Sequence, residues 1–144
     1  MAEIRNRAEN FRRYLERHFG IVLPEGVGIF YAKGVRAGSS EIVRCGIKGE
    51  LGYAACDEGF NPTNSFIQNF GHLATRNVVE LDEGRAKEFA VGRGIGKMEL
   101  GTKSGHVVVR YKEFTVGLGY YDADEKKVKN RIPEKRRRKI INGF

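Results

Sequence analysis

The sequence predicts an α+β fold, with an N-terminal helix-and-strand lobe followed by a second, strand-rich lobe. Three observations lead to this prediction. One stretch near the N-terminus has the apolar spacing of a helix, several later stretches are short apolar runs bounded by turn residues, and 19 of the 144 residues are glycine. Glycine makes up about 7% of an average protein, so its high share here favours many tight turns over a helix bundle.

The N-terminal stretch, residues 3–18, is predicted to be an amphipathic helix that ends near Gly20. The apolar residues that recur at helical spacing are Ile4, Ala8, Phe11 and Leu15. Arginines and glutamates are interleaved on the remaining positions. This mixture favours a solvent-exposed face over a phosphate-binding one.

Residues 27–56 change to a strand pattern. Three short apolar runs are predicted as strands: 27–32, 41–47 and 51–56. The stretch 33–40 is expected to be a loop, and the short glycine-containing gap at 48–50 favours a hairpin. Cys45 and Cys56 lie in two of these strands and are expected to be buried thiols, with a disulfide between them left open.

Two short helices are predicted in the middle of the chain. The first covers residues 62–70, with Asn61 as its N-cap and Pro62 in its first position. The side chains that it would bury are Phe66, Ile67 and Phe70. The second helix covers residues 83–90 and is capped by Asp82.

Two strands are predicted in the C-terminal part, over residues 106–112 and 113–121, with a tight turn between them. Strict alternation in the second strand places four larger side chains on the core face: Phe114, Val116, Leu118 and Tyr120. The opposite face is then almost bare, because it carries Thr115, Gly117 and Gly119. Alternation also places Tyr121 beside this bare face, where its ring would stack on a base.

The patterns of known enzyme sites are not found. The glycine cluster at 91–98 fails as a phosphate loop, because Met98 stands where a hydroxyl is needed to hold magnesium. Two cysteines and three histidines do not form a zinc pattern, and the carboxylates are scattered. We therefore expect no catalysis, no metal and no cofactor.

The hydropathy pattern gives no sign of a membrane or of secretion. No apolar run approaches the roughly 20 residues that span a bilayer. The first ten residues lack the apolar core of a signal peptide. We expect a cytoplasmic protein with no membrane partner.

The net charge of +8 is concentrated at the C-terminal end. Residues 126–144 carry nine Lys and Arg against one Glu, whereas residues 1–125 carry 17 residues of each sign. A localised basic block favours a polyanionic partner, because its field attracts and holds phosphates.

This basic block has two interpretations, a disordered tail and an ordered strand-turn. Val128 and Ile132 are spaced through it as apolar anchors, and a proline stiffens the residues that precede it. We favour an ordered element that carries Lys129 and Arg131, followed by a looser cluster over residues 135–139.

The run from Gly105 to Arg138 resembles the C-terminal RNA-binding domain of the Nop/Sun family of RNA 5-methylcytosine methyltransferases. The segments that carry the resemblance are Gly117-Leu118-Gly119, Lys129-Asn130-Arg131-Ile132-Pro133 and the basic run 135–138. The resemblance covers roughly residues 58–138, and more loosely the N-terminal lobe. The resemblance implies a PUA-like β pseudobarrel over residues 75–144, preceded by an α/β lobe over residues 1–74.

The residue patterns and the resemblance together assign RNA binding to a set of residues: Arg76, Gly117, Gly119, Tyr121, Lys129, Asn130, Arg131, Pro133, Lys135, Arg136, Arg137 and Arg138. Glu134 departs from the family, which usually has a basic residue at that position. The family's catalytic domain, with its cofactor-binding sheet and paired cysteines, is not found in this sequence. The resemblance therefore does not imply activity.

We predict a stand-alone RNA-binding module for structured ribosomal or transfer RNA, acting in ribosome biogenesis or RNA modification without catalysis of its own. The alternative is a non-catalytic partner that supplies RNA affinity to a separate RNA methyltransferase. Exposed apolar residues on the N-terminal lobe would favour that alternative. A DNA-binding protein is less favoured, because no recognition helix is evident.

Overall fold

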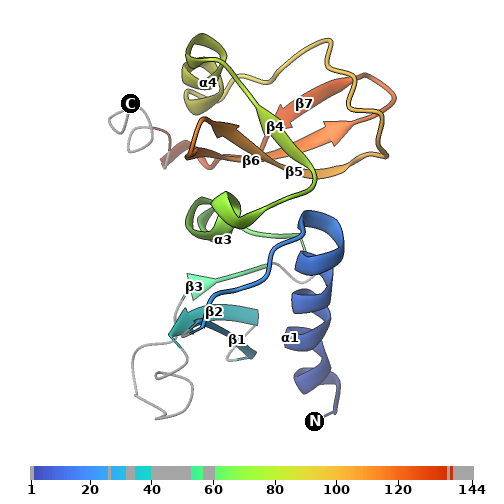
Figure 1. The fold of residues 1–144 in the computed structure, drawn as a ribbon, viewed down its shortest axis with the longest axis vertical. Coiled ribbons are helices and arrows are strands. Elements are labelled where there is room, and N and C mark those ends of the chain that lie inside the picture. The colour runs from blue at the N-terminus through green and yellow to red at the C-terminus, as the bar shows by residue number, and fades with distance from the viewer. Residues whose placement is uncertain are drawn as a thin grey trace. The chain divides into compact units, whose positions relative to one another are not determined.

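A computed structural model describes most of the chain, namely residues 2–25, 27–31, 35–39, 53–56, 61–135 and 137. It divides into two compact units, Met1–Arg76 and Asn77–Phe144 (Figure 1), and each combines helices with one sheet. The predicted α+β class is therefore confirmed. Among the described residues, no helix has the length and apolar character needed to cross a membrane.

The first unit begins with the predicted amphipathic helix. Helix α1 (Ala2–Tyr14) continues into a π-helical turn, η1 (Leu15–Phe19). Gly20 ends it in the left-handed conformation, with φ of 66°, as the sequence predicts. Phe11, Leu15 and Phe19 of this helical segment are fully buried, and the Phe11 ring contacts the Phe66 ring edge-on at 5.5 Å.

The sheet of the first unit contains β1 (Val27–Tyr31), β2 (Val35–Ser39) and β3 (Tyr53–Ala54), paired antiparallel in that order. The presence of β2 corrects the expected loop at 33–40. Val35 and Ala37 alternate into the core, but the small residues between and after them hide this alternation in the sequence.

The other predictions in this region concern the two cysteines and the segment 41–50. Cys56 is buried, as expected of a small apolar residue. The predicted strand at 41–47, the hairpin turn at 48–50 and Cys45 lie outside the described residues.

The next helix, α3 (Asn64–Phe70), begins later than the sequence predicts. Its N-cap is Thr63, whose hydroxyl accepts a hydrogen bond of 3.1 Å from the Phe66 N–H, and not Asn61. Pro62 does not open the helix, because it forms a β-bridge with Cys56. Of the apolar residues expected to be buried, two are fully buried and Phe70 is half-buried. A 3₁₀ turn, η2 (Gly71–Leu73), follows.

The second unit contains a mixed sheet with the order β4-β5-β6-β7. Its strands are β4 (Val78–Glu80), β5 (Gly105–Tyr111), β6 (Phe114–Asp122) and β7 (Lys127–Asn130). Only the β4–β5 pair is parallel. Helix α4 (Glu83–Ala90) has the predicted bounds, and Asp82 caps it by accepting a 2.8 Å hydrogen bond from the Arg85 N–H. Over the described residues the sheet remains open, with β4 and β7 at its edges.

Helix α4 supplies one side of the core of this unit (Figure 1). Phe89 is fully buried and packs in one apolar cluster with residues of the sheet: Val107, Val109, Val116, Tyr121 and Val128. The chain after α4 then runs along β7, where Ile95 forms a bridge with Val128. This contact joins the loop after the helix to the edge of the sheet.

A β-bulge in β6 corrects the face assignment made from alternation. Val109 pairs with Gly117 but Arg110 pairs with Thr115, so Val116 is an extra residue in β6. Val116 is buried as predicted, and the alternation is inverted beyond it. The expected burial of Phe114 is wrong, because this first residue of β6 lies at the turn and is 38% exposed, whereas Leu118 is buried, but on the face opposite Val116. Tyr121 then lies in the core, and Tyr120 lies on the opposite face.

Candidate nucleic-acid interface

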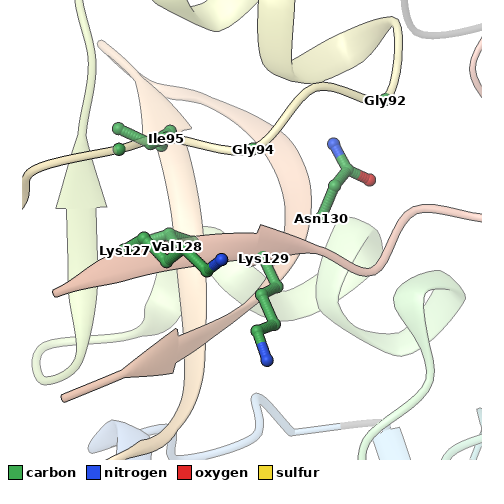
Figure 2. A pocket seen from close by; sticks show the side chains of 8 residues that line it. Gly92, Gly94, Ile95, Lys127, Val128, Lys129 and Asn130 are labelled. Atoms are coloured by element: carbon green, nitrogen blue, oxygen red, sulfur yellow. The ribbon is translucent and has the colours of Figure 1, made fainter. Parts of the chain in front are cut away.

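Strand β7 sorts the residues of the basic block onto two faces. Val128 and Ile132 are 1% and 2% exposed, which confirms them as the apolar anchors that the sequence predicts. Figure 2 shows the side chains of Lys129 and Asn130 leaving the strand in opposite directions. The predicted Lys-Asn-x-x-Pro motif is therefore split, because Lys129 lies on the face away from α4 and Asn130 points toward the helix.

Asn130 connects three segments of the second unit. Its side-chain amide donates to the carbonyl oxygens of Phe89, at 2.6 Å, and Arg93, at 3.1 Å. Its Oδ1 accepts a 2.9 Å hydrogen bond from the Ile132 N–H. These bonds use both donors and one acceptor site of the amide, so Asn130 holds the end of α4 against β7. Its observed contacts are structural.

The cations on the other face of β7 stand beside carboxylates. Lys129 Nζ lies 3.5 Å from Asp122 Oδ2, and Lys127 pairs with Glu125. The backbone N–H groups of Glu125 and Asp124 hold the pKa of the Asp122 carboxyl below its ordinary value, and Lys129 adds to this effect. Glu125 raises the pKa of Lys127. Lys127 therefore stays charged, and the nearby carboxylates partly neutralise the field of both lysines.

An aromatic group that the sequence analysis missed lies next to these cations. His106, Tyr120 and Lys129 face one another in register across β5, β6 and β7. The rings of His106 and Tyr120 meet edge-on at 5.1 Å, and the Arg131 guanidinium lies over the Tyr120 ring at 5.7 Å. Tyr120, and not Tyr121, is the half-exposed aromatic residue. Sequence alternation failed to identify Tyr120 because the bulge at Val116 inverts the faces of β6 beyond that residue.

A shallow cavity of about 330 Å³ lies between the glycine-rich loop after α4 and β7 (Figure 2). Backbone lines much of it, because Gly92, Gly94 and Gly96 contribute no side chains. A Cβ at Gly94 would lie 2.9 Å from the Val128 carbonyl oxygen, so this glycine permits the loop to approach the strand. The close approach of this loop to β7 therefore explains part of the glycine cluster that fails as a phosphate loop.

The turn after β7 carries the remaining described cations of the block. Lys135 is exposed, and Arg137 donates from Nε to the Ile132 carbonyl oxygen at 3.3 Å. Pro133 is exposed and precedes this turn. Arg136 and Arg138 belong to the predicted cluster, but their positions lie outside the described residues.

Three predicted site residues of β6 lie away from the cationic face of β7. Tyr121 is 2% exposed, and Gly117 and Gly119 are buried on its side of β6. A Cβ at Gly119 would lie 2.7 Å from Val128 Cγ1, so the bare face is covered by the protein's own core. The prediction that these residues form an open stacking surface is wrong, because the bulge turns them inward.

Arg76 belongs to the first unit, where it caps the end of the helical segment. Its guanidinium donates to the Arg17 carbonyl oxygen at 3.0 Å, and its backbone N–H donates to the Phe19 carbonyl oxygen at 3.0 Å. A cation at the C-terminal end of a helix satisfies its last carbonyl groups and complements its dipole. The contacts of Arg76 that the structure shows are therefore those of a helix cap.

Within the part of the chain that the structure describes, no three His, Cys, Asp or Glu side chains come together as metal ligands. The chemistry available on the second unit is therefore that of cations, an aromatic pair and backbone amides.

Comparison with known proteins gives one family and several relatives. Residues 76–138 match the model of the methyltransferase RsmF PUA domain. A ribosomal RNA small subunit methyltransferase F from Aeromonas salmonicida is 33% identical over 135 residues, which cover 88% of this chain and 27% of that relative. Proteins of the same name from Aeromonas hydrophila and Psychromonas ingrahamii are 33% and 31% identical over 76 and 75 residues, each covering 15% of the relative.

The chain thus spans well under half of the length of these relatives. The match coincides with the second unit, which carries α4, the four-stranded sheet and the described part of the basic block. Residues 76–138 thus match a PUA domain of the RsmF type, in agreement with the resemblance to the Nop/Sun family, and the chain covers only part of the length of these relatives.

Proposed function

We propose that this chain is an RNA-binding module for structured RNA that has no catalytic activity of its own. The observation that carries the proposal is the cationic face of β7, where Lys127 and Lys129 flank the buried Val128 and Arg131, just after the strand, lies over Tyr120. Because these groups are fixed on a strand, they would meet the phosphates of a folded RNA without first having to be ordered. The match to the RsmF PUA domain supports RNA as the polyanion.

The class of RNA follows from the relatives and from the chemistry of the surface. The relatives are named as methyltransferases of small-subunit ribosomal RNA, so ribosomal RNA is the first candidate and transfer RNA the second. One half-exposed tyrosine offers little stacking area, and cations dominate the face. Such a surface favours the shape and backbone of structured RNA over the bases of a single strand. We place the module in ribosome biogenesis or RNA modification in the cytoplasm.

The proposal includes a PUA-like pseudobarrel for the second unit. One feature of the open sheet supports the pseudobarrel. The segment after α4 pairs with the edge strand β7 and so extends the sheet. Two contacts fix this extension, the Ile95–Val128 bridge and a 2.7 Å hydrogen bond from the Met98 N–H to the Lys126 carbonyl oxygen. We retain residues 1–74 as the preceding lobe and residues 75–144 as the RNA-binding domain.

One observation favours the alternative, a non-catalytic partner that brings RNA affinity to a separate methyltransferase. Val22 in the first unit is 68% exposed, and it borders a cavity of about 190 Å³ with Ile21 and Leu23. We take Val22 as the candidate contact point for such a partner, because it is apolar, exposed and beside a cavity. Replacing Val22→Ser should leave RNA binding unchanged and weaken the association with a methyltransferase chain, measured by co-purification.

The first test measures binding to purified small-subunit ribosomal RNA at several salt concentrations. The variant Lys129→Ala/Arg131→Ala removes two cations from the face of β7, and Lys87→Ala/Lys103→Ala removes two exposed cations elsewhere in the same unit. If about four phosphates are neutralised, log Kd should change with log salt with a slope near 3. The first variant should lower that slope by about 0.7 through the loss of Arg131, and the loss of Lys129, whose ammonium lies 3.5 Å from Asp122, should add little.

The outcomes separate the proposals. A loss of affinity in the first variant alone supports the strand as the RNA contact. Equal losses in both variants would mean that only net charge matters. A chain truncated after Glu134 tests the rest of the block, and if only the truncation weakens binding, the proposed interface on β7 is wrong.

A further inference from the structure

We infer that Arg137 is a positioning residue, which fastens the turn after β7 to Gly92 and so holds the second half of the basic block in place. This inference rests on the proposed RNA-binding function and concerns how its surface is built. Gly92 has φ of 105°, a conformation that favours glycine. A Cβ there would lie 2.5 Å from Arg137 Nη1 and 2.8 Å from its Nε, so the guanidinium packs directly on the Gly92 backbone.

The contact is part of a continuous chain of interactions. The amide of Asn130 binds the carbonyl oxygens of Phe89 and Arg93 on either side of Gly92. The same side chain accepts from the Ile132 N–H, and the Ile132 carbonyl oxygen accepts from Arg137 Nε. The chain around Ile132 is therefore bound to the loop after α4 at two places. Asn130 makes the contact before Ile132, and Arg137 makes the contact after it.

The electrostatics of the contact agree with this role. The Gly92 turn follows the last residues of α4, where backbone carbonyl oxygens point outward. A guanidinium beside them is favoured by the helix dipole. Arg137 is only half-exposed, whereas Lys135 in the same turn is exposed. We infer that Arg137 holds the turn, and that Lys135 is the residue of this turn that it presents to phosphate.

The decisive variant is Gly92→Ala, because it removes no charge from the basic block. Its methyl group would occupy the space of the Arg137 guanidinium, so the turn should detach. Gly101→Ala is the matched control, since Gly101 also has a positive φ, of 70°, but nothing lies within 4 Å of its Cβ position. The control accounts for backbone strain without displacing Arg137.

The first readout is trypsin cleavage after Lys135 in the absence of RNA. We expect cleavage to be about tenfold faster in Gly92→Ala and in Arg137→Ala than in the wild type, and little changed in Gly101→Ala. Equal rates in wild type, Gly92→Ala and Arg137→Ala would overturn the inference, whatever RNA binding shows. Thermal unfolding of each variant confirms that the comparison is made on folded protein.

The second readout is the affinity for small-subunit ribosomal RNA. Gly92→Ala and Arg137→Ala should each weaken binding about fivefold, and the double variant should be no weaker than Arg137→Ala alone. If the Gly92 variant does not fold, Arg137→Lys decides. A lysine keeps the charge but not the planar contact, so it should behave like Arg137→Ala, and retention of wild-type affinity would instead make Arg137 a phosphate contact.

The two readouts distinguish failure of the inference from failure of the proposed function. Faster cleavage of the variants, with no RNA binding by any protein, would support the fastened turn and refute the RNA-binding proposal. Unchanged cleavage, with RNA binding by the wild type, would refute only the fastened turn.

Discussion

The two halves of the basic block differ in how their charge is held. In the first half, residues 126–131, three lysines stand beside carboxylates that come from outside the block or from its edge. Those pairs are Lys126–Glu99, Lys127–Glu125 and Lys129–Asp122. In the second half, neither Lys135 nor Arg137 forms an ion pair with another residue that the structure describes.

This difference shows that counting charged residues along the sequence does not locate the positive electrostatic potential of the protein. The lysines of the first half are built into the sheet or its turn and are largely neutralised locally, whereas Lys135 and Arg137 follow the sheet and have no carboxylate partner among the described residues. A phosphate approaching the first half must compete with Asp122 or Glu125, which lowers its net gain. The predictions below test this comparison, from the largest expected effect to the smallest.

The largest effect is expected from Asn130→Ala, which releases the first half from α4. The variant loses three hydrogen bonds and leaves two carbonyl oxygens of the α4 end without these donors. We expect the free energy of unfolding to fall by about 3 kcal/mol. Urea unfolding measures it.

Asn69→Ala is the matched control for that variant. It removes one exposed hydrogen bond, from Asn69 to the Ser65 carbonyl oxygen, and should cost less than about 1 kcal/mol. Similar losses in the two variants would show that Asn130 is not the structural tie that the geometry indicates.

A smaller effect is expected from single lysines in the two halves. Lys135→Ala should lower the salt slope of RNA binding by about 0.7, because the exposed ammonium of Lys135 meets no carboxylate among the described residues. Lys126→Ala should leave the slope nearly unchanged, since Glu99 stands 3.5 Å from the Lys126 ammonium. A larger loss in the Lys126 variant would reverse the comparison between the two halves.

The smallest effect is expected from Asp122→Asn, which removes the charge that competes for Lys129. Asparagine keeps an oxygen that accepts from the Asp124 and Glu125 N–H groups, so the turn should be retained. We expect RNA affinity to rise about twofold. Fluorescence anisotropy with the same RNA measures this change, and unchanged affinity would mean that the pair does not compete with phosphate.

The pH dependence of stability gives an independent check on Asp122. Its pKa is lowered in the folded protein, so its contribution is present above the unfolded-state pKa and is lost as the pH falls through the folded-state pKa. The stability difference between wild type and Asp122→Asn should therefore shrink below about pH 4. A difference that stays constant on acidification would contradict the assigned cause.

The sequence predicted the elements whose signals are local. Helix α4 carries its own cap in Asp82, and the first helix combines a strong apolar face with a terminal Gly20. Val128 and Ile132 were recognised as anchors because they are the apolar residues of a charged stretch. In each case the residues that decide the structure are neighbours in the sequence.

The parts that could not be predicted depend on contacts between distant residues. The bulge at Val116 arises from the pairing of β6 with β5, and no residue type within β6 indicates it. The role of Asn130 depends on carbonyl groups at Phe89 and Arg93, about forty positions away in the chain. Strand β2 was missed because its core contains a small residue, Ala37, whose burial is decided by its partners.

The bulge also determines which changes of length β6 can accept in evolution. Loss of Val116 would restore a regular ladder, because Thr115 and Gly117 already pair with consecutive residues of β5. Loss of one residue between Gly117 and Tyr121 would instead exchange the two tyrosines between core and surface. Relatives that differ by one residue in this strand are therefore expected to differ at the bulge, and an alignment that places the gap elsewhere would compare a core tyrosine with a surface one.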